Sequence, residues 1–205
     1  MKIIGSLTSP YVRKVRIILA EKQIHYEFSV DNPWDSSTRV SSHNPLGKIP
    51  VLIMDNEDIL YDSRVIAEYL DSIESPQSAI HLIPRSSYDR TMVKRWEALA
   101  DGICDAAATI FLERKRPTSQ QSHEWIARQQ QKIEMGIKAA AVELGDREWC
   151  HGHTFTLADI ALGCAMDYLT LRFPEIQWRA TYANLTGLAG RLTQRTSFID
   201  TAPKG

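Results

Sequence analysis

The sequence has no long hydrophobic run and almost no net charge. None of its 205 residues lies in a stretch approaching the ~18 continuous apolar residues of a membrane-spanning helix. Turn residues follow Met1 too closely to leave space for the apolar core of a signal peptide. The formal net charge is -1 and the pI is about 6.6, so no overall field would attract the chain to nucleic acid or an anionic membrane. We therefore expect a cytoplasmic protein with neither nucleic acid nor membrane among its partners.

Cysteine is scarce. Cys104, Cys150 and Cys164 are widely spaced, and no two of them form a C-x-x-C pair. Three isolated thiols provide neither a disulfide framework nor a thioredoxin-type redox pair, so we expect reduced, structural cysteines. Residues 150–153 (CHGH) have the residue types of a zinc site, but zinc ligands at this close spacing need a second pair, and the sequence has none. We predict no metal and interpret the cluster as a loop before a helix.

The first part of the chain combines short strands with helices. A chain of 205 residues is long enough for one large or two small domains. The apolar and β-branched runs predict strands at residues 2–5, 25–30, 51–54 and 59–60, the last two flanking a polar hairpin turn at residues 55–58. Helices are predicted at residues 10–22 and 63–73. This order, strand-helix-strand followed by a hairpin and a helix, is that of a thioredoxin-like α/β fold.

The pattern changes after a segment that favours neither helix nor strand. Residues 75–87 contain two prolines and four serines, and we place a linker at residues 77–86. Beyond it the sequence predicts only helices, at residues 88–116, 120–144, 157–172 and 182–194. The predicted organisation is therefore an α/β domain at residues 1–76 and an all-helical domain at residues 87–205.

Two local motifs of the helical part have structural interpretations. The cation-rich turn at residues 113–116 (ERKR) suits the negative end of a helix dipole, and we interpret it as a solvated helix end that needs no partner. Thr156 and Asp159 have the spacing of a capping box, with Phe155 and Ile160 as the matching hydrophobic staple. We therefore expect Asp159 to stabilise the start of a helix and not to act in catalysis.

Ser9-Pro10-Tyr11 places a hydroxyl at the start of the first helix. Ser is a preferred N-cap residue and Pro is favoured at the first helical position, so capping alone explains the pair. A cap uses the hydroxyl oxygen as an acceptor and leaves the O–H free to donate. Because backbone N–H groups and the helix dipole favour an anion at this position, a bound thiolate would suit it.

Four motifs in order along the chain carry a family resemblance. They are residues 9–16 (SPYVRKVR), residues 44–52 (NPLGKIPVL), Asp62-Ser63, and the Gly152 to Asp159 segment with its capping box. Together they resemble a cytosolic glutathione transferase of the serine type, as found in bacteria. The resemblance implies a thioredoxin-like domain that binds glutathione, a helical domain that receives the second substrate, glutathione as co-substrate, a small electrophile, and a homodimer.

The resemblance also implies roles for individual residues. Ser9 would donate a hydrogen bond to the glutathione thiolate, and because members with Cys at this position exchange thiols, Ser favours conjugation. Thr8 is a rival donor, but Pro10 favours Ser9 as the cap. The Ile49-Pro50 bond is expected to be cis, which would let the Ile49 backbone pair with the cysteinyl part of glutathione.

The remaining expected contacts lie at either end of the tripeptide. Ser63 would hold the γ-glutamyl carboxylate at a helix N-terminus and Asp62 the γ-glutamyl amine, although a capping role, which either residue can hold, also explains the pair. Many members have Glu or Gln in place of Asp62, so its contact can be direct or bridged by water. Lys48 and Trp34 are candidates for the glycyl end.

The electrophile would bind near a set of apolar residues, of which all but the first lie on one predicted helix: Tyr11, Ile103, Ala107, Ile110 and Phe111. Two other functions stay open: a glutathione-binding or regulatory protein without turnover, and a glutathione-dependent peroxidase or isomerase.

Overall fold

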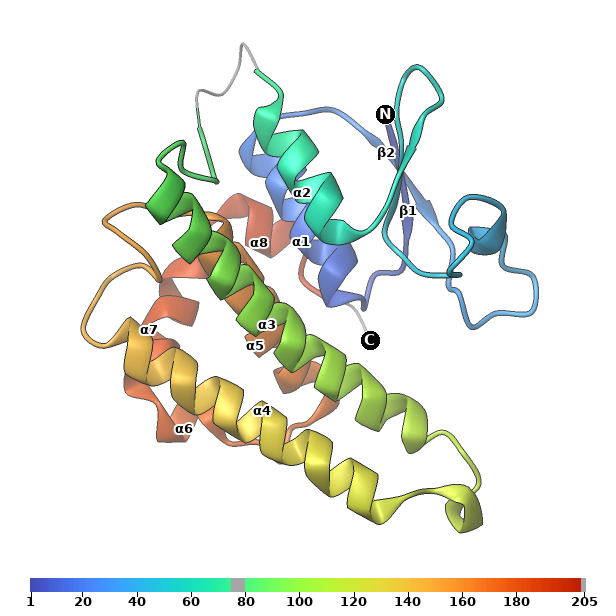
Figure 1. Ribbon diagram of the computed structural model, residues 1–205, viewed down its shortest axis with the longest axis vertical. Coiled ribbons are helices and arrows are strands. Elements are labelled where there is room, and N and C mark those ends of the chain that lie inside the picture. Colours follow the sequence, from blue (N-terminus) through green and yellow to red (C-terminus); the bar gives the residue numbers. More distant parts are fainter. Residues whose placement is uncertain (75–79, 204–205) are drawn as a thin grey trace. The chain divides into compact units, whose positions relative to one another are not determined.

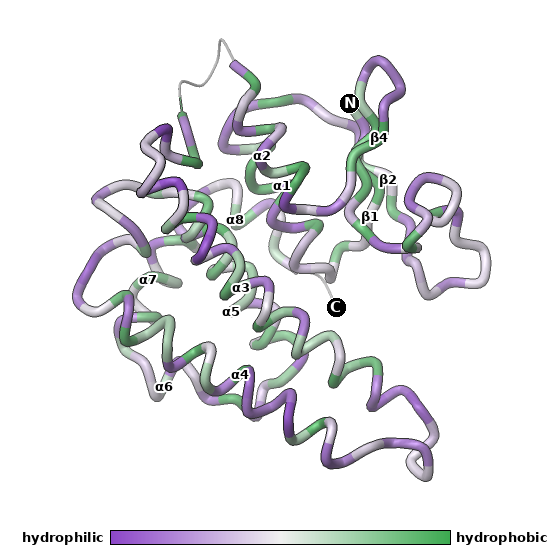
Figure 2. The backbone as a smooth tube through the Cα atoms, in the orientation of Figure 1, coloured by the Kyte–Doolittle hydropathy of each residue, from purple (hydrophilic) through white to green (hydrophobic). Residues whose placement is uncertain are grey.

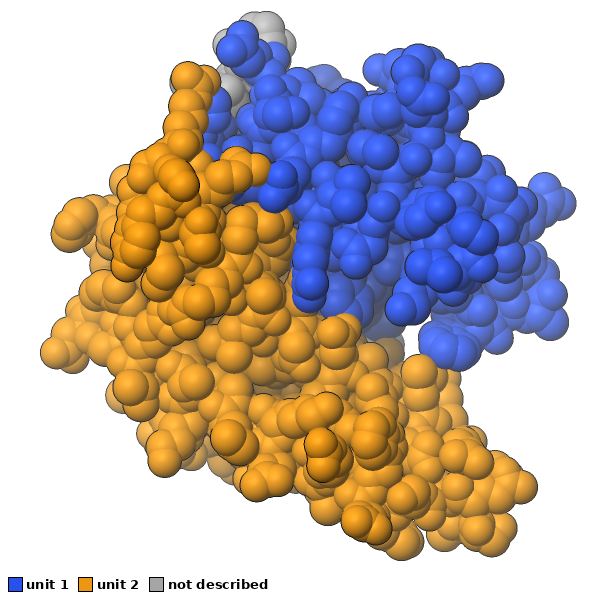
Figure 3. Space-filling model, viewed as in Figure 1, with its two compact units in different colours: residues 1–83, 194–205 blue, residues 84–193 orange. Residues whose placement is uncertain are grey.

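The computed structural model describes residues 1–74 and 80–203. The chain forms two compact units (Figure 3): unit 1 comprises residues 1–83 and 194–205, and unit 2 comprises residues 84–193. The change between units falls inside the predicted linker at 77–86, of which residues 77–79 lie outside the described residues. The end of the chain differs from the prediction, because residues 194–205 group with unit 1 and not with the helices that precede them.

Unit 1 is built on a four-stranded sheet of order β2-β1-β3-β4. The strands are β1 (Lys2–Gly5), β2 (Glu27–Val30), β3 (Val51–Ile53) and β4 (Ile59–Leu60). β1 is parallel to β2 and antiparallel to β3, and β3 and β4 form the predicted hairpin. Ile3 and Ile4 of β1 and Val51 and Leu52 of β3 are all buried, as expected for aliphatic residues on the two central strands.

The helical elements of unit 1 are α1 (Pro10–Glu21), the short 3-10 turn η1 (Val40–Ser42), α2 (Ser63–Ser72) and α8 (Thr196–Asp200). α1 packs against α2, and Figure 1 shows the two lying side by side. Lys22, at the C-cap of α1, is buried, and its Nζ donates to the Asp71 carbonyl in the last turn of α2 at 2.7 Å. A cation is favoured at the negative end of a helix dipole, so Lys22 ties the C-terminal ends of the two helices together.

The first turn of α1 lies very close to β1. A Cβ added at Gly5 would lie only 2.5 and 2.8 Å from the two Cγ carbons of Val12. Val12 is fully buried, so its side chain has little space into which to move. Glycine at the end of β1 therefore lets the start of α1 approach the sheet.

α8 is tied to α1 by polar contacts that sequence reasoning did not predict. Arg195 donates from Nε and Nη2 to the two carboxylate oxygens of Glu21, at 2.8 and 2.6 Å. Ser197 Oγ donates to the same carboxylate at 2.5 Å. Arg13 of α1 donates from Nη2 to the Phe198 carbonyl at 3.2 Å and lies over the Phe198 ring. These bonds explain why the end of the chain belongs to unit 1.

Unit 2 is helical. Its elements are α3 (Ser87–Glu113), the 3-10 turn η2 (Thr118–Gln120), α4 (His123–Leu144), α5 (Leu157–Arg172), α6 (Trp178–Thr181) and α7 (Ala183–Leu192). α3 packs against both α4 and α5, and Gly136 lets α4 approach Ile103 closely. Figure 2 shows hydrophilic and hydrophobic residues alternating along α4, the pattern of a helix with one buried face. No helix in the described ranges is long and apolar enough to cross a membrane.

The predicted fold class, α/β followed by all-α, is confirmed. The predicted helices 88–116, 120–144, 157–172 and 182–194 correspond to α3, α4, α5 and α7, although the second begins as η2 and the last ends sooner. The short helices α6 and α8 were not predicted. Each has at most five residues, too few for a hydrophobic period to be visible in the sequence.

The predicted capping box at the start of α5 is confirmed. The buried Asp159 carboxylate accepts from the Thr156 N–H at 2.8 Å, and Thr156 Oγ1 accepts from the Ala158 N–H at 3.3 Å. Asp159 also accepts from the Cys150 N–H at 2.7 Å. Burial raises the pKa of Asp159, and these backbone hydrogen bonds lower it in part. Asp159 therefore joins the preceding loop to the helix.

Candidate functional site

Ser9 is the N-cap of α1, as predicted. Its backbone is extended, with φ -74 and ψ 123, and its Oγ accepts a hydrogen bond from the Val12 N–H at 3.3 Å. Pro10 is the first helical residue. Within the described parts of the chain no acceptor takes the Ser9 hydroxyl proton, and the side chain is partly exposed. The hydroxyl can therefore donate to a ligand at the positive end of the α1 dipole.

The sheet topology brings the predicted glutathione-binding residues of unit 1 to one end of the sheet. The chain leaves the C-terminal end of β1 and leads into α1 (Figure 1), whose N-cap is Ser9. β3 is antiparallel to β1, with Val51 opposite Ile4, so Ile49-Pro50 enters β3 at this same end. β4 in turn is antiparallel to β3, with Leu60 opposite Leu52, so Asp62-Ser63 also follows here. Three predicted segments, far apart in sequence, thus share one sheet end.

The Ile49-Pro50 peptide bond is cis, as the resemblance implied. Pro50 is buried, and the Ile49 side chain packs against a core cluster that includes Ile4 and Val51. The Ile49 side chain is thus partly buried, and the contact of its backbone with glutathione stays a prediction.

The loop before Ile49 is shaped by Asn44, a residue to which sequence reasoning assigned no role. Asn44 is buried; its Nδ2 donates to the Lys48 carbonyl at 2.9 Å and its Oδ1 accepts from the Leu46 N–H at 3.0 Å. Gly47 has φ +60, a conformation that favours glycine. The Asn-Pro-Leu-Gly sequence is typical of such a turn and could have indicated it.

Asp62 and Ser63 begin α2. Asp62 is the N-cap: its Oδ1 accepts from the Arg64 N–H at 2.8 Å, and the residue is exposed. The Tyr61-Asp62 peptide bond is cis. Ser63 is the first helical residue and is 3% exposed. Of the two residues that the sequence offered as the cap, Asp62 is therefore the one that caps α2, and its carboxylate keeps a second oxygen for a ligand.

Lys48 and Trp34 are the two candidates for the glycyl end. Trp34 is exposed, and Lys48 belongs to the loop that leads into β3. Trp34 follows β2, which is parallel to β1 and pairs Val30 with Gly5, so the chain after β2 also starts from this end of the sheet. Topology therefore groups both with the Ser9 end.

The residues predicted to contact the electrophile are not equally accessible. Tyr11, the second residue of α1, is partly exposed. On α3, Ile103, Ala107 and Ile110 are at most 2% exposed and belong to the core of unit 2. Phe111 is the α3 residue of the set that is partly exposed. Burial removes the other three α3 residues from the candidate contacts, because helical spacing does not distinguish a core face from a binding face.

The CHGH segment at residues 150–153 has structural contacts. The Cys150 N–H donates to Asp159, and burial raises the pKa of the Cys150 thiol well above its ordinary value. His151 Nε2 lies 2.9 Å from Asp89 Oδ1 in the first turn of α3. Among the residues that the structure describes, no group of three or more His, Cys, Asp or Glu side chains has the arrangement of a metal site.

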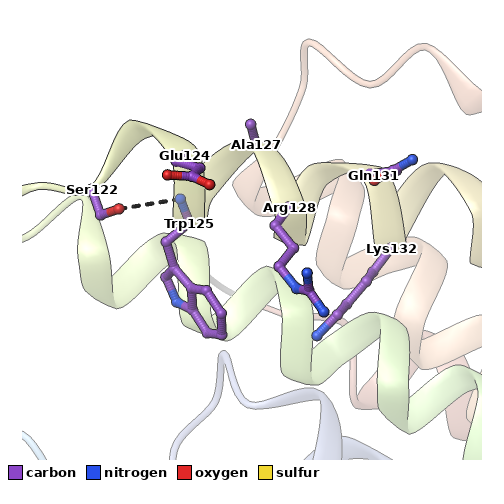
Figure 4. Close-up of a pocket in the computed structure, with 7 residues that line it drawn as sticks. All are labelled: Ser122, Glu124, Trp125, Ala127, Arg128, Gln131 and Lys132. Atoms are coloured by element: carbon purple, nitrogen blue, oxygen red, sulfur yellow. Dashed lines mark hydrogen bonds between the residues drawn. The ribbon is translucent and has the colours of Figure 1, made fainter.

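A surface hollow lies along the first turns of α4 (Figure 4). Ser122 caps this helix by accepting from the Trp125 N–H at 3.2 Å, and Lys132 Nζ lies 5.8 Å from the centre of the Trp125 ring. None of the residues predicted to bind glutathione lines this hollow.

Known proteins match this chain over almost its whole length. The family model for the N-terminal domain of glutathione S-transferases matches residues 8–73, and that for the C-terminal domain matches residues 124–189. An uncharacterised glutathione S-transferase-like protein of Escherichia coli K12, YibF, is 39% identical over 203 residues, which cover 99% of this chain and 98% of YibF. The chain belongs to the glutathione S-transferase family.

Two solved structures in this family are very similar. A glutathione S-transferase from Methylobacillus flagellatus KT with glutathione bound is 45% identical, with a TM-score of 0.95 and 99% of both chains covered. One from Methylobacterium radiotolerans JCM 2831, in complex with glutathione sulfonate, is 44% identical, with a TM-score of 0.94 and 100% and 95% coverage of the two chains. The N-terminal family match lies within unit 1 and includes every residue predicted to bind glutathione.

Proposed function

We propose that the chain is a glutathione transferase that conjugates the glutathione thiolate to small electrophilic molecules, with Ser9 donating a hydrogen bond to the thiolate sulfur. The observation that carries this proposal is the geometry of Ser9. Its oxygen accepts the Val12 N–H while its proton has no other acceptor among the described residues. The similarity to transferases with bound glutathione or glutathione sulfonate supports glutathione as the ligand.

The Ser9 hydroxyl and the α1 N-terminus can supply the free energy needed to lower the pKa of the glutathione thiol. A free cysteine thiol has a pKa near ~8.5, and lowering it by two units requires about 2.7 kcal/mol of preference for the thiolate. A hydrogen bond to a charged group contributes about 1.5–3 kcal/mol, and a helix N-terminus about 0.3–1 kcal/mol or somewhat more when partly buried. The Ser9 hydroxyl and the α1 N-terminus together can therefore keep most of the bound thiol ionised near pH 7.

The other segments at the Ser9 end would hold the tripeptide in place. In this proposal the Ile49 backbone pairs with the cysteinyl backbone, as one residue of added strand. The Ser63 N–H and O–H bind the γ-glutamyl carboxylate at the α2 N-terminus, and Asp62 binds the γ-glutamyl amine. Lys48 reaches the glycyl carboxylate.

The reaction follows from these roles. The thiol of bound glutathione loses its proton to water, and the Ser9 hydroxyl stabilises the thiolate that remains. The sulfur attacks an electrophilic carbon, a carbon–sulfur bond forms, and the leaving group departs with its electron pair, or an activated double bond takes up the electrons and later a proton. Ser9 keeps its own proton throughout and forms no covalent bond.

A direct test compares Ser9→Ala with the matched control Thr8→Ala, which removes the neighbouring hydroxyl. We expect Ser9→Ala to lower kcat with 1-chloro-2,4-dinitrobenzene at least tenfold while glutathione affinity changes by less than a few-fold. Thr8→Ala should retain wild-type kcat. If Thr8→Ala loses activity and Ser9→Ala does not, the donor has been misassigned.

Turnover itself is tested by retention on immobilised glutathione followed by assays on a panel of electrophiles and peroxides. Retention with conjugation supports the transferase, and retention with peroxide reduction alone would replace it by a peroxidase. Retention without any turnover would leave a binding or regulatory protein.

Family resemblance further supports a cytoplasmic homodimer that detoxifies electrophiles. Light scattering coupled to size-exclusion chromatography should give about twice the chain mass of 23.2 kDa. A mass of one chain at micromolar concentration would contradict the dimer and leave the site proposal standing.

A further inference from the structure

Arg13 joins the start of α1 to α8, the short helix near the end of the chain. Arg13 is buried, and both helices belong to unit 1. Its Nη2 donates to the Phe198 carbonyl at 3.2 Å, and its Nε donates to Thr201 Oγ1 at 3.4 Å. The guanidinium carbon also lies 5.3 Å from the centre of the Phe198 ring. One side chain of α1 thus binds two residues at the C-terminal end of α8.

The acceptors of the Arg13 hydrogen bonds lie in a well-packed part of unit 1. Phe198 and Thr201 are both buried. The Ala202 N–H, which would bind the Phe198 carbonyl if α8 continued, donates instead to the Ile199 carbonyl at 3.3 Å. The Phe198 carbonyl is therefore available to Arg13. Because a guanidinium presents its N–H donors in a rigid fork, it can bind this carbonyl and the Thr201 hydroxyl at the same time.

Arg13 is also joined to Ser9 through the backbone. The Arg13 N–H donates to the Ser9 carbonyl at 3.0 Å, and the neighbouring Val12 N–H donates to Ser9 Oγ at 3.3 Å. Val12 in turn lies close to Gly5 at the end of β1. The turn that follows Ser9 therefore contacts the sheet through Val12 and α8 through Arg13. Two contacts from consecutive residues fix the orientation of this turn, and with it the direction of the Ser9 hydroxyl.

We infer that Arg13 is a positioning residue for Ser9: it uses α8 to hold the first turn of α1 in the orientation in which the Ser9 hydroxyl donates to the glutathione sulfur. This inference rests on the proposed function, because the Ser9 hydroxyl acts in that reaction. Groups that act on a reacting atom must be held within about 0.5 Å of their productive position, and a displacement of about 1 Å can cost on the order of a hundredfold in rate. In this role Arg13 touches neither the sulfur nor the electrophile.

Arg16 offers a comparison on the same helix. Its Nε donates to the Tyr26 hydroxyl at 3.3 Å, and its guanidinium carbon lies 4.6 Å from the centre of the Phe28 ring. These partners belong to β2 and to the residue before it. Arg16 thus makes the same kinds of contact as Arg13, a hydrogen bond and a cation on an aromatic ring, but it joins α1 to the sheet and not to α8.

The pKa of the bound glutathione thiol tests the inference, with Arg16→Met as the matched control for Arg13→Met. Each substitution keeps an unbranched apolar stem and removes the donors. We expect Arg13→Met to raise the thiol pKa by about 0.5 units or more and to lower kcat with 1-chloro-2,4-dinitrobenzene about fivefold or more, with glutathione affinity within about threefold. Arg16→Met should leave the thiol pKa within about 0.2 units of wild type. A loss of stability alone would not move this pKa in a protein that is still folded.

Two results would overturn the positioning role. One is a wild-type thiol pKa in folded Arg13→Met, and the other is an equal rise in Arg16→Met, which would show a general loosening of α1. Arg13→Lys keeps the charge but not the fork, so it should raise the thiol pKa about half as much. It takes the place of Arg13→Met if that variant does not fold, and a wild-type pKa in Arg13→Lys would also overturn the inference.

Amide hydrogen exchange without glutathione separates this inference from the proposed function. Because the Val12 N–H bonds to Ser9 Oγ, its exchange rate reports on the cap with no thiolate present. We expect exchange at Val12 to be about threefold faster or more in Arg13→Met and unchanged in Arg16→Met. Unchanged exchange in Arg13→Met would overturn the role of Arg13 even if the wild-type protein is a transferase. If wild-type protein leaves the thiol pKa of bound glutathione at its free value, the proposed function fails, and faster Val12 exchange would still support the hold of Arg13 on the cap.

Discussion

Gly5 and Val12 set the position of the α1 N-terminus, and a methyl group at residue 5 should disturb it. In Gly5→Ala the new Cβ would start 2.5 and 2.8 Å from the Val12 Cγ carbons, far inside the ~3.5–4.0 Å of ordinary carbon contacts. Overpacking of this kind costs about 1–3 kcal/mol, and the lower chain entropy of unfolded alanine returns about 0.4–1 kcal/mol. We expect a net loss of about 1–2 kcal/mol in the free energy of unfolding.

A double-mutant cycle with Val12→Ala tests whether contact between residues 5 and 12 causes the loss of stability in Gly5→Ala. Val12→Ala alone removes two buried methyl groups and should cost about 2 kcal/mol. It also removes the atoms that the new methyl group at residue 5 would meet, so Gly5→Ala in the Val12→Ala background should cost nothing or be slightly stabilising. The coupling energy should therefore be about 1–2 kcal/mol, measured by urea unfolding with unchanged m-values.

Additive losses from the two substitutions would contradict a steric contact between residues 5 and 12. If the double variant loses the sum of the two single losses within about 0.5 kcal/mol, the approach of Gly5 to Val12 does not determine the position of α1. Because the Val12 N–H donates to Ser9 Oγ, Gly5→Ala should also lower kcat more than it weakens glutathione binding.

Three further predictions concern binding, capping and pH. Ser63→Ala should weaken glutathione binding about tenfold by calorimetry with no change in the bound thiol pKa; an altered pKa with unchanged affinity would contradict its role. Asp159→Ala removes the acceptor of bonds at 2.7, 2.8 and 3.1 Å and should cost about 3 kcal/mol in urea unfolding, and a loss under about 1 kcal/mol would contradict the capping account. Burial raises the pKa of Glu21, but hydrogen bonds from Arg195 and Ser197 and the Arg195 charge outweigh it, so the folded pKa is lowered. Its stabilisation is present above the unfolded pKa of about 4.3 and lost as pH falls through the folded value, so Glu21→Gln should show a shallower loss of stability below about pH 4 than wild type.

Sequence reasoning succeeded where the physical rule is local. Ser9, Asp62 and the Thr156–Asp159 box were predicted from preferences that act within one helical turn, and the structure confirms all three as caps. The Ile49-Pro50 cis bond came from the family resemblance, because the residues themselves favour trans.

Features that depend on distant residues were missed. The attachment of α8 through Glu21 and Arg195 joins residues 174 positions apart, and no local pattern indicates it. In the same way, Arg172 lies over the Phe111 ring, a contact between two helices that no local pattern indicates. Helical spacing also placed Ile103 and Ile110 among binding candidates, because periodicity reveals a face of a helix but not what covers it.

The role proposed for Ser9 is to stabilise the thiolate of bound glutathione, and the absorbance of that thiolate as a function of pH measures this role directly. The wild-type complex should titrate well below the ~8.5 of a free thiol, and the Ser9→Ala complex at least one unit higher than wild type, with glutathione affinity within a few-fold. Equal thiol pKa values in the two complexes would contradict the account.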